Sequence, residues 1–221
     1  MTGARIAIVA FVLATLTNLI SLAAGAHLVS EWSQNLMIPC LVVALLLSPT
    51  TPDAPLPRLR RGTLAGLLLS WLGDLLPGFV PDDLAFLVMV GAFLCGHLAF
   101  CWAFWPLRRA SLLGRPGALP SLAAYVVAYV VLMAAVWSGA GALRVPILVY
   151  GLVLTLMAVL ATGVHRLATL GGILFMVSDS LIALQAFRGW HGAAVPVAIM
   201  GTYGAACLLI LLAVLRRLRR P

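Results

Sequence analysis

Long stretches of apolar residues, separated by short polar segments, constrain this chain more than any other feature. A helix that crosses a bilayer needs about 20 mainly apolar residues, and the sequence offers eight segments that meet or approach that length. They span residues 5–24, 34–48, 62–79, 83–105, 119–138, 144–162, 167–187 and 192–215. We therefore predict an all-α fold in which residues 1–221 form a single transmembrane domain, a bundle of eight spanning helices.

The composition excludes the common water-soluble classes. Of the 221 residues, 63% are hydrophobic and only 9% are charged, whereas a soluble domain has roughly a quarter of its residues charged. The net charge of +8 does not indicate a nucleic-acid partner, because the 14 basic residues are all Arg and lie mostly between the apolar segments. A soluble enzyme, a disordered tail and a soluble nucleic-acid binder are excluded, and the expected environment is a lipid bilayer.

The arginines also predict the orientation of the helices. With eight spans, twelve arginines fall on the side that holds both termini, and only Arg144 and Arg188 fall on the other. The twelve are Arg5, Arg58, Arg60, Arg61, Arg108, Arg109, Arg115, Arg166, Arg216, Arg217, Arg219 and Arg220. Because loops rich in Lys and Arg stay in the cytoplasm, we predict a multi-pass protein of the cell membrane with cytoplasmic N- and C-termini.

Two acidic residues, Asp74 and Asp179, lie inside predicted spans, whereas Glu31, Asp53, Asp82 and Asp83 are placed in loops. A charged group within a spanning helix costs about 2.5–3.5 kcal/mol on insertion scales, so it is retained only where it faces protein or water. Each Asp follows the start of its segment by 12 residues, or ~18 Å, on parallel helices. The two carboxylates are candidates for an acid–base pair that shares a proton in one cavity. The alternative is a pair of helix-packing residues satisfied by Ser hydroxyls.

Other polar residues within the spans are weaker candidates. His97 is the one His placed in mid-span, and Tyr125, Tyr129, Tyr150 and Tyr203 are candidates for lining a cavity. The remaining His residues fall at loop positions, so the sequence predicts neither a metal site nor another cofactor. The sequence lacks a Gly-x-Ser-x-Gly motif, which disfavours a serine hydrolase. The segment Ser48–Arg61 is rich in Pro and is expected to be a stiff connector.

Four sequence blocks together resemble the YhhN family of integral membrane proteins, the lysoplasmalogenases. The strongest runs from Gly172 to Phe187 and is similar to G-x-L-F-x-x-S-D-x-x-L-A-x-x-x-F. Ser70 to Asp74 resembles S-x-x-G-D, Phe93 to His97 resembles F-x-x-G-H, and Pro146, Tyr150 and Met157 fit the pattern of the sixth helix. The chain departs from the family at Gln34 and Asn35, where Lys-Pro is common, and at Phe100 and Cys207, which replace Tyr and Gln.

The resemblance implies hydrolysis of the vinyl ether bond of a lysoplasmalogen, giving a fatty aldehyde and glycerophosphocholine or glycerophosphoethanolamine. One Asp of the pair would protonate the alkene carbon, and the other would stabilise the cation and deprotonate water. The catalytic residues would be Asp74 and Asp179. The residues that position the substrate or tune the pair would be His97, Ser70, Ser178, Tyr150 and Tyr203.

Two alternatives to a hydrolase use the same residues differently. A proton-coupled transporter or a lipid-binding membrane protein would use the Asp pair as a proton relay. A transporter is disfavoured because the spans carry no symmetric pair of Gly or Pro interruptions. A purely structural membrane protein is disfavoured because two buried Asp residues would be an unnecessary cost. The oligomeric state is left open by the sequence.

Overall fold

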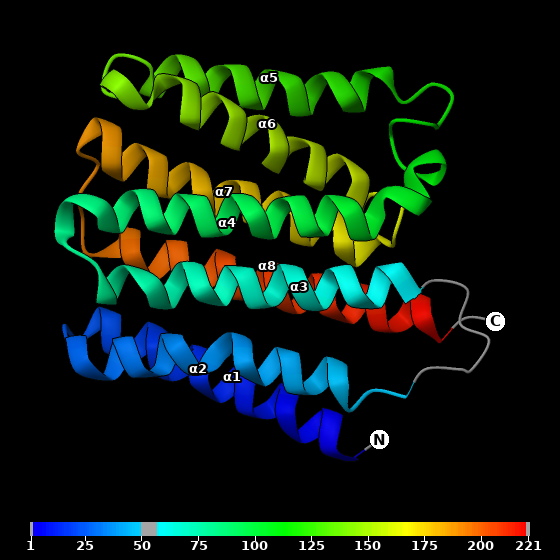
Figure 1. Ribbon diagram of the computed structural model, residues 1–221, viewed down its shortest axis with the longest axis horizontal. Coiled ribbons are helices and arrows are strands. Elements are labelled where there is room, and N and C mark those ends of the chain that lie inside the picture. Colours follow the sequence, from blue (N-terminus) through cyan, green and yellow to red (C-terminus); the bar gives the residue numbers. More distant parts are fainter. Residues whose placement is uncertain (1, 50–56, 220–221) are drawn as a thin grey trace.

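The computed structural model describes residues 2–49 and 57–219, and within these segments it consists of eight long helices joined by short turns (Figure 1). The helices are α1 (Thr2–Ala23), α2 (His27–Leu46), α3 (Pro57–Leu75), α4 (Asp82–Phe104), α5 (Leu119–Val136), α6 (Arg144–Ala161), α7 (Arg166–Arg188) and α8 (Ala194–Leu218). Three 3-10 helices, η1 (Leu76–Phe79), η2 (Trp105–Ala110) and η3 (Gly141–Leu143), lie between them. All eight long helices have the length and hydropathy of membrane spans, which confirms the predicted class: this is a multi-pass membrane protein.

The second helix begins earlier than its predicted range of 34–48. It starts at His27, because the polar residues of its first turns are satisfied locally. The Ser30 and Ser33 hydroxyls donate to carbonyls three or four residues back on the same helix. The Asn18 side chain of α1 donates to the Ser30 carbonyl at 2.8 Å. Glu31 was expected in a loop and instead lies on the exposed side of this helix.

Two further polar segments differ from the expectation. Asp82 and Asp83 form the first turn of α4 and are not in a loop; negative side chains are favourable there because the amino end of a helix carries partial positive charge. Helix α3 begins at Pro57, so the end of the predicted connector is already helical. Pro52, Asp53 and Pro55 of the connector, and Arg220, lie outside the described residues.

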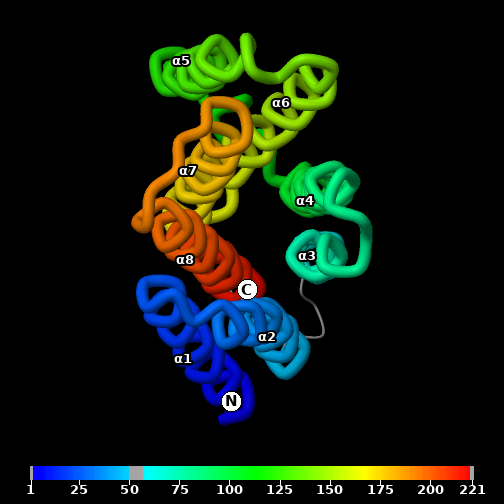
Figure 2. The backbone as a smooth tube through the Cα atoms, turned by 90° about the vertical axis from the view of Figure 1, so that its left-hand side faces the viewer, coloured from blue at the N-terminus to red at the C-terminus, as the bar shows by residue number. Residues whose placement is uncertain are grey.

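Four helices form the middle of the bundle. Helices α3 and α4 lie beside each other and face α7 and α8, while the α1–α2 pair flanks them on one side and the α5–α6 pair on the other (Figures 1 and 2). Helices adjacent in the sequence run in opposite directions, so that both described ends of the chain lie at the same end of the bundle (Figure 1). The middle helices are therefore the ones that can enclose a site.

Small residues bring α3 and α4 close together. A Cβ atom placed on Gly62 would lie 2.6 Å from the Ala103 Cβ, and one on Gly66 would lie 2.8 Å from the Phe100 ring. Lipid is as apolar as the helix surfaces, so helices in a membrane associate through this kind of close packing and not through burial from water. These contacts fix which face of α3 is turned toward α4.

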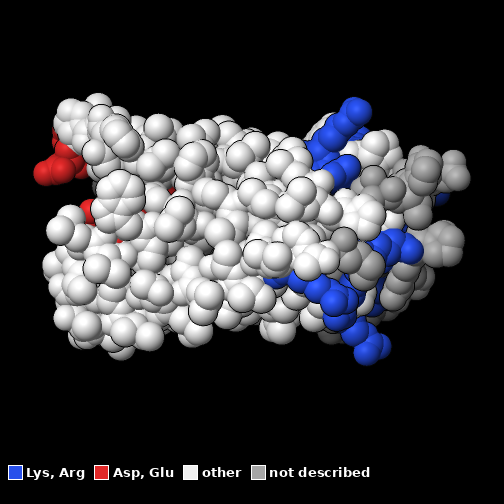
Figure 3. Space-filling model, turned by 90° about the horizontal axis from the view of Figure 1, so that it is seen from below, with Lys and Arg blue, Asp and Glu red and all other residues white. Residues whose placement is uncertain are grey.

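The charged residues are divided between the two ends of the bundle. Arginines gather at one end, and acidic residues lie at the other, some of them inside a hollow (Figure 3). The end with the termini carries Arg5, Arg58, Arg60, Arg61, Arg108, Arg109, Arg115, Arg166, Arg216, Arg217 and Arg219. The other carries Arg144 and Arg188. We call these the arginine-rich end and the arginine-poor end.

Candidate active site

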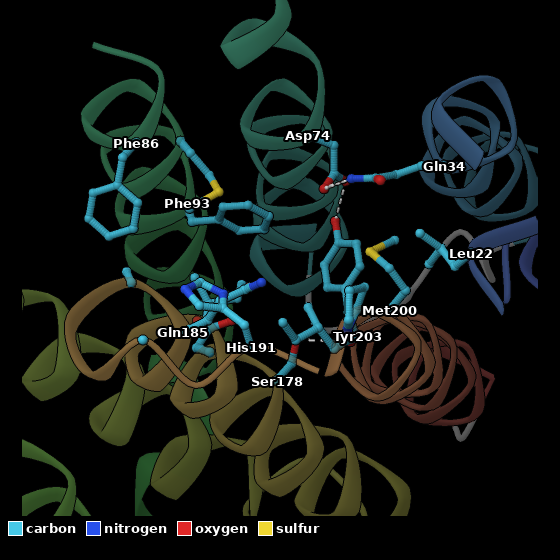
Figure 4. Close-up of a pocket in the computed structure, with 17 residues that line it drawn as sticks. Leu22, Gln34, Asp74, Phe86, Phe93, Ser178, Gln185, His191, Met200 and Tyr203 are labelled. Carbon is cyan, nitrogen blue, oxygen red and sulfur yellow. Dashed lines mark hydrogen bonds between the residues drawn. The ribbon is translucent and has the colours of Figure 1, made fainter. Parts of the chain in front are cut away.

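A cavity of about 580 Å³ lies toward the arginine-poor end, among the four middle helices and next to α1 and α2 (Figure 4). We call it the main cavity. Its polar lining consists of Gln34, Asp74, Ser178, Asp179, Gln185, His191 and Tyr203, and most of its other lining residues are apolar. The two carboxylates singled out from the sequence, one from α3 and one from α7, therefore line the same space.

Asp74 is held by two neutral donors. The Gln34 side chain on α2 donates from Nε2 to Asp74 Oδ1 at 3.1 Å, and the Tyr203 hydroxyl on α8 donates to Asp74 Oδ2 at 2.8 Å (Figure 4). Asp74 lies one residue before the end of α3. Three helices thus meet at this carboxyl group, and neither of its two partners carries a charge.

Asp179 is held differently, by a cluster that includes a histidine. The Tyr150 hydroxyl on α6 donates to Asp179 Oδ2 at 2.5 Å, and His97 Nε2 on α4 lies 3.1 Å from both of these oxygens. When Asp179 is ionised and the Tyr150 hydroxyl donates to it, neither oxygen has a proton left for the ring, so His97 Nε2 is then the donor. The His97 side chain is fully buried, and its contact with Asp179 is an ion pair when the ring is protonated.

Aromatic rings pack between the two carboxylates. Phe93 and Phe175 each meet the Tyr203 ring edge to face, with centroids 5.7 Å and 5.5 Å away. Phe175 also packs against the His97 ring, at 4.7 Å. Rings in this arrangement hold the Tyr203 hydroxyl toward Asp74 and surround both acids with apolar surface, where electrostatic interactions are stronger than in water.

The other residues predicted for the site are dispersed. Ser178 lines the main cavity, but its hydroxyl donates to the Ile199 carbonyl at 3.1 Å and so connects α7 to α8. Ser70 is buried between α3 and α4, near Gly96, and does not line the main cavity. Tyr150 lines a second, smaller cavity of about 50 Å³, almost entirely apolar, which adjoins the first at Asp179. Tyr125 and Tyr129 line neither of these cavities.

Sequence reasoning missed three polar side chains of the main cavity. Gln34 was noted only as a departure from a family pattern, although an amide within a spanning helix is itself a signal of a polar partner. Gln185 follows Ser178 by seven residues, a spacing that places both on one helix face. His191 lies just beyond the end of α7 at Arg188, where Gly189, with a φ of +63°, turns the chain back toward the cavity. No sequence signal indicated His191.

The part of the chain that the structure describes contains no group of three or more His, Cys, Asp or Glu side chains arranged to hold a metal ion. The main cavity does contain two carboxyl groups, those of Asp74 and Asp179. A pair of carboxyl groups with different partners can divide the roles of proton donor and proton acceptor.

Comparison with known proteins identifies similar chains. The YhhN family model matches residues 30–214, a range that includes both carboxylates and every side chain bonded to them. Two proteins named lysoplasmalogenase, from Mycobacterium bovis and Mycobacterium tuberculosis, are each 35% identical to the chain over 175 residues. These alignments cover 76% of this chain and 66% of each relative, just under two thirds of its length. No solved structure matches the chain.

Proposed function

Because the chain belongs to the YhhN family, we propose that it is a membrane-embedded hydrolase that cleaves the vinyl ether bond of lysoplasmalogens. The products are a fatty aldehyde and glycerophosphocholine or glycerophosphoethanolamine. The names of the two mycobacterial relatives support this activity. The observation that carries the proposal is that Asp74 and Asp179, from different helices and with different partners, line one cavity within the bundle.

We assign Asp74 as the general acid and Asp179 as the base. His97 and Tyr150 both direct protons at Asp179, and an ionised carboxylate gains more from such donors than a neutral acid does. Asp74 has only neutral partners, so of the two carboxyl groups it is the one to which we assign the shared proton. The partners thus separate the roles of two chemically identical groups.

The reaction begins when Asp74 transfers its proton to the β-carbon of the vinyl ether, which produces an oxocarbenium ion. The Asp179 carboxylate stabilises the cation and then takes a proton from water as the water oxygen bonds to the cationic carbon. In the resulting hemiacetal, the hydroxyl returns its proton to Asp74, and Asp179 protonates the departing glycerol oxygen. The aldehyde and the glycerophosphodiester are released, and both carboxyl groups are back in their starting states.

The main cavity suits a single-chain lipid. Its polar side chains lie beside apolar ones such as Phe86, Met89 and Ile182, so a polar head and an alkenyl chain can both be accommodated. His97, Tyr150 and Tyr203 hold the two acids, whereas Ser178 is part of the wall and Ser70 supports the packing of α3 on α4. The substrate contacts we propose are therefore fewer than the sequence suggested.

We further propose that the protein is inserted in the cell membrane with its arginine-rich end, and both termini, in the cytoplasm. Eleven of the thirteen described arginines lie at that end, which is the distribution expected of cytoplasmic loops.

The activity is tested with purified protein in detergent, given lysoplasmenylcholine or a saturated lysophosphatidylcholine. Mass spectrometry follows fatty aldehyde and glycerophosphocholine. We expect aldehyde from the vinyl ether lipid alone, and its loss in Asp74→Asn and in Asp179→Asn. Activity that survives both substitutions would contradict the mechanism. Folded protein that releases no aldehyde would contradict the function and favour a proton-coupled transporter or a lipid-binding protein.

A further inference from the structure

The main cavity is displaced toward the arginine-poor end of the bundle. Asp179 lies nine residues before the end of α7, about 14 Å along the helix, and thirteen residues from its start, about 20 Å. Asp74 is one residue from the end of α3 at this same end. The cavity also includes Gly189 and His191 of the α7–α8 turn, both of which are exposed. Its mouth is therefore at the arginine-poor end, where acidic atoms are visible inside a hollow (Figure 3).

The half of the bundle toward the arginine-rich end is closed by a packed apolar core. Leu41 and Leu45 of α2, Phe104 of α4 and Val214 of α8 are at most 1% exposed and belong to one continuous cluster. The close contact of Gly62 with Ala103 seals α3 against α4 at the same level. A polar head group could not cross this region without leaving its phosphate unsatisfied among apolar side chains.

From these two features we infer that the site is open on the non-cytoplasmic face only, and that it takes single-chain vinyl ether phospholipids from the outer leaflet or from the medium outside. The inference rests on the proposed function for the identity of the lipid, and on the arginine distribution for the orientation. The glycerophosphodiester product leaves on the outer side, and the aldehyde remains with the apolar helices or the membrane.

The same arrangement assigns the head-group subsite. A lipid that enters from the mouth with its chain buried keeps its phosphate near the surface, where Gln185 and His191 supply hydrogen-bond donors. The vinyl ether, which lies between head group and chain, is then brought to the depth of the two carboxylates. Gln185 and His191 are thus positioning residues for the head group of the proposed substrate.

The access is tested by labelling cysteines with a charged maleimide that cannot cross the membrane. Ala186→Cys places a thiol on an exposed residue that lines the cavity, and Ala142→Cys places one at the same end but outside it. Leu113→Cys places one at the arginine-rich end. The unsubstituted chain is the blank, because its four cysteines all lie within the spanning helices.

In intact spheroplasts we expect labelling of Ala186→Cys and Ala142→Cys, and labelling of Leu113→Cys only after the membrane is permeabilised. Added saturated lysophosphatidylcholine should slow the labelling of Ala186→Cys and leave that of Ala142→Cys unchanged. The inference would be overturned if Leu113→Cys were labelled in intact spheroplasts and Ala142→Cys only after permeabilisation. It would also be overturned if the Ala186→Cys thiol reacted only after permeabilisation. Equal labelling rates with and without the lipid would overturn the subsite. None of these readouts needs hydrolysis, so a protein that labels as expected and releases no aldehyde refutes the proposed function alone.

Discussion

Replacing Tyr150 by Phe tests whether Asp179 is the charged member of the acid pair. The substitution removes one hydroxyl, which donates to Asp179 Oδ2 at 2.5 Å, and retains the aromatic ring. A hydrogen bond to a charged group contributes about 1.5–3 kcal/mol. Because about 1.36 kcal/mol corresponds to a tenfold change in rate, we expect kcat to fall roughly 10- to 150-fold.

Tyr203→Phe is the matched comparison, because Tyr203 makes the equivalent bond to Asp74 at 2.8 Å. If Asp74 holds the shared proton, this bond joins two neutral groups and contributes only about 0.5–1.5 kcal/mol. The expected loss in kcat is then about 2- to 13-fold. The order of the two losses, more than either size, reports which carboxyl group carries the charge.

The assay measures aldehyde release at saturating lysoplasmenylcholine, and a thermal unfolding curve for each variant shows that the protein is folded. Tyr129→Phe is the control, since its hydroxyl donates to the Leu148 carbonyl and lies outside the main cavity. We expect its kcat to be nearly unchanged. A larger loss for Tyr203→Phe than for Tyr150→Phe would reverse the assignment of acid and base. Equal losses in all three variants would show that the hydroxyls contribute to folding only.

Three further predictions concern packing, a buried hydrogen bond and metal dependence. Gly66→Leu should lower the apparent melting temperature, because even a Cβ there would meet the Phe100 ring at 2.8 Å and overpacking costs about 1–3 kcal/mol. Gly91→Leu is the control: a Cβ at Gly91 would meet nothing within 4 Å, so this variant should unfold at the same temperature as the parent. Asn18→Ala should cost about 0.5–1.5 kcal/mol in thermal stability, because it removes the buried hydrogen bond that joins α1 to the Ser30 carbonyl, which keeps the Ser33 hydroxyl as a donor. Treatment with EDTA should leave aldehyde release unchanged, because the proposed mechanism assigns every proton transfer to the two carboxyl groups; a loss that added metal restores would contradict it.

The sequence was sufficient for the architecture and for singling out two carboxylates that line one cavity, whose catalytic role stays a prediction. Crossing a bilayer requires long apolar helices, so the eight spans could be located from hydropathy alone, although the third begins five residues, and the second seven residues, before its predicted start. The first turns of the second helix are polar and satisfied by hydrogen bonds that hydropathy does not register. Asp74 and Asp179 stood out because ionisable residues are rare in spans. Their predicted spacing of 12 residues from each helix start is wrong: because α3 begins earlier than predicted, Asp74 lies 17 residues and Asp179 lies 13 residues after the start of its helix.

The partners of the two acids, in contrast, were decided by tertiary structure. His97 and Tyr150 belong to Asp179, and Tyr203 belongs to Asp74, although nothing in the spacing of these residues distinguishes one pairing from another. In a soluble protein the polar side of a helix shows which face is turned inward. In a membrane both the lipid-facing and the core-facing sides are apolar, so rotation about each helix axis is set by close packing, such as that of Gly66 on Phe100. The sequence therefore determined how many helices cross the membrane and which acids lie within them, and packing determined which side chains reach those acids.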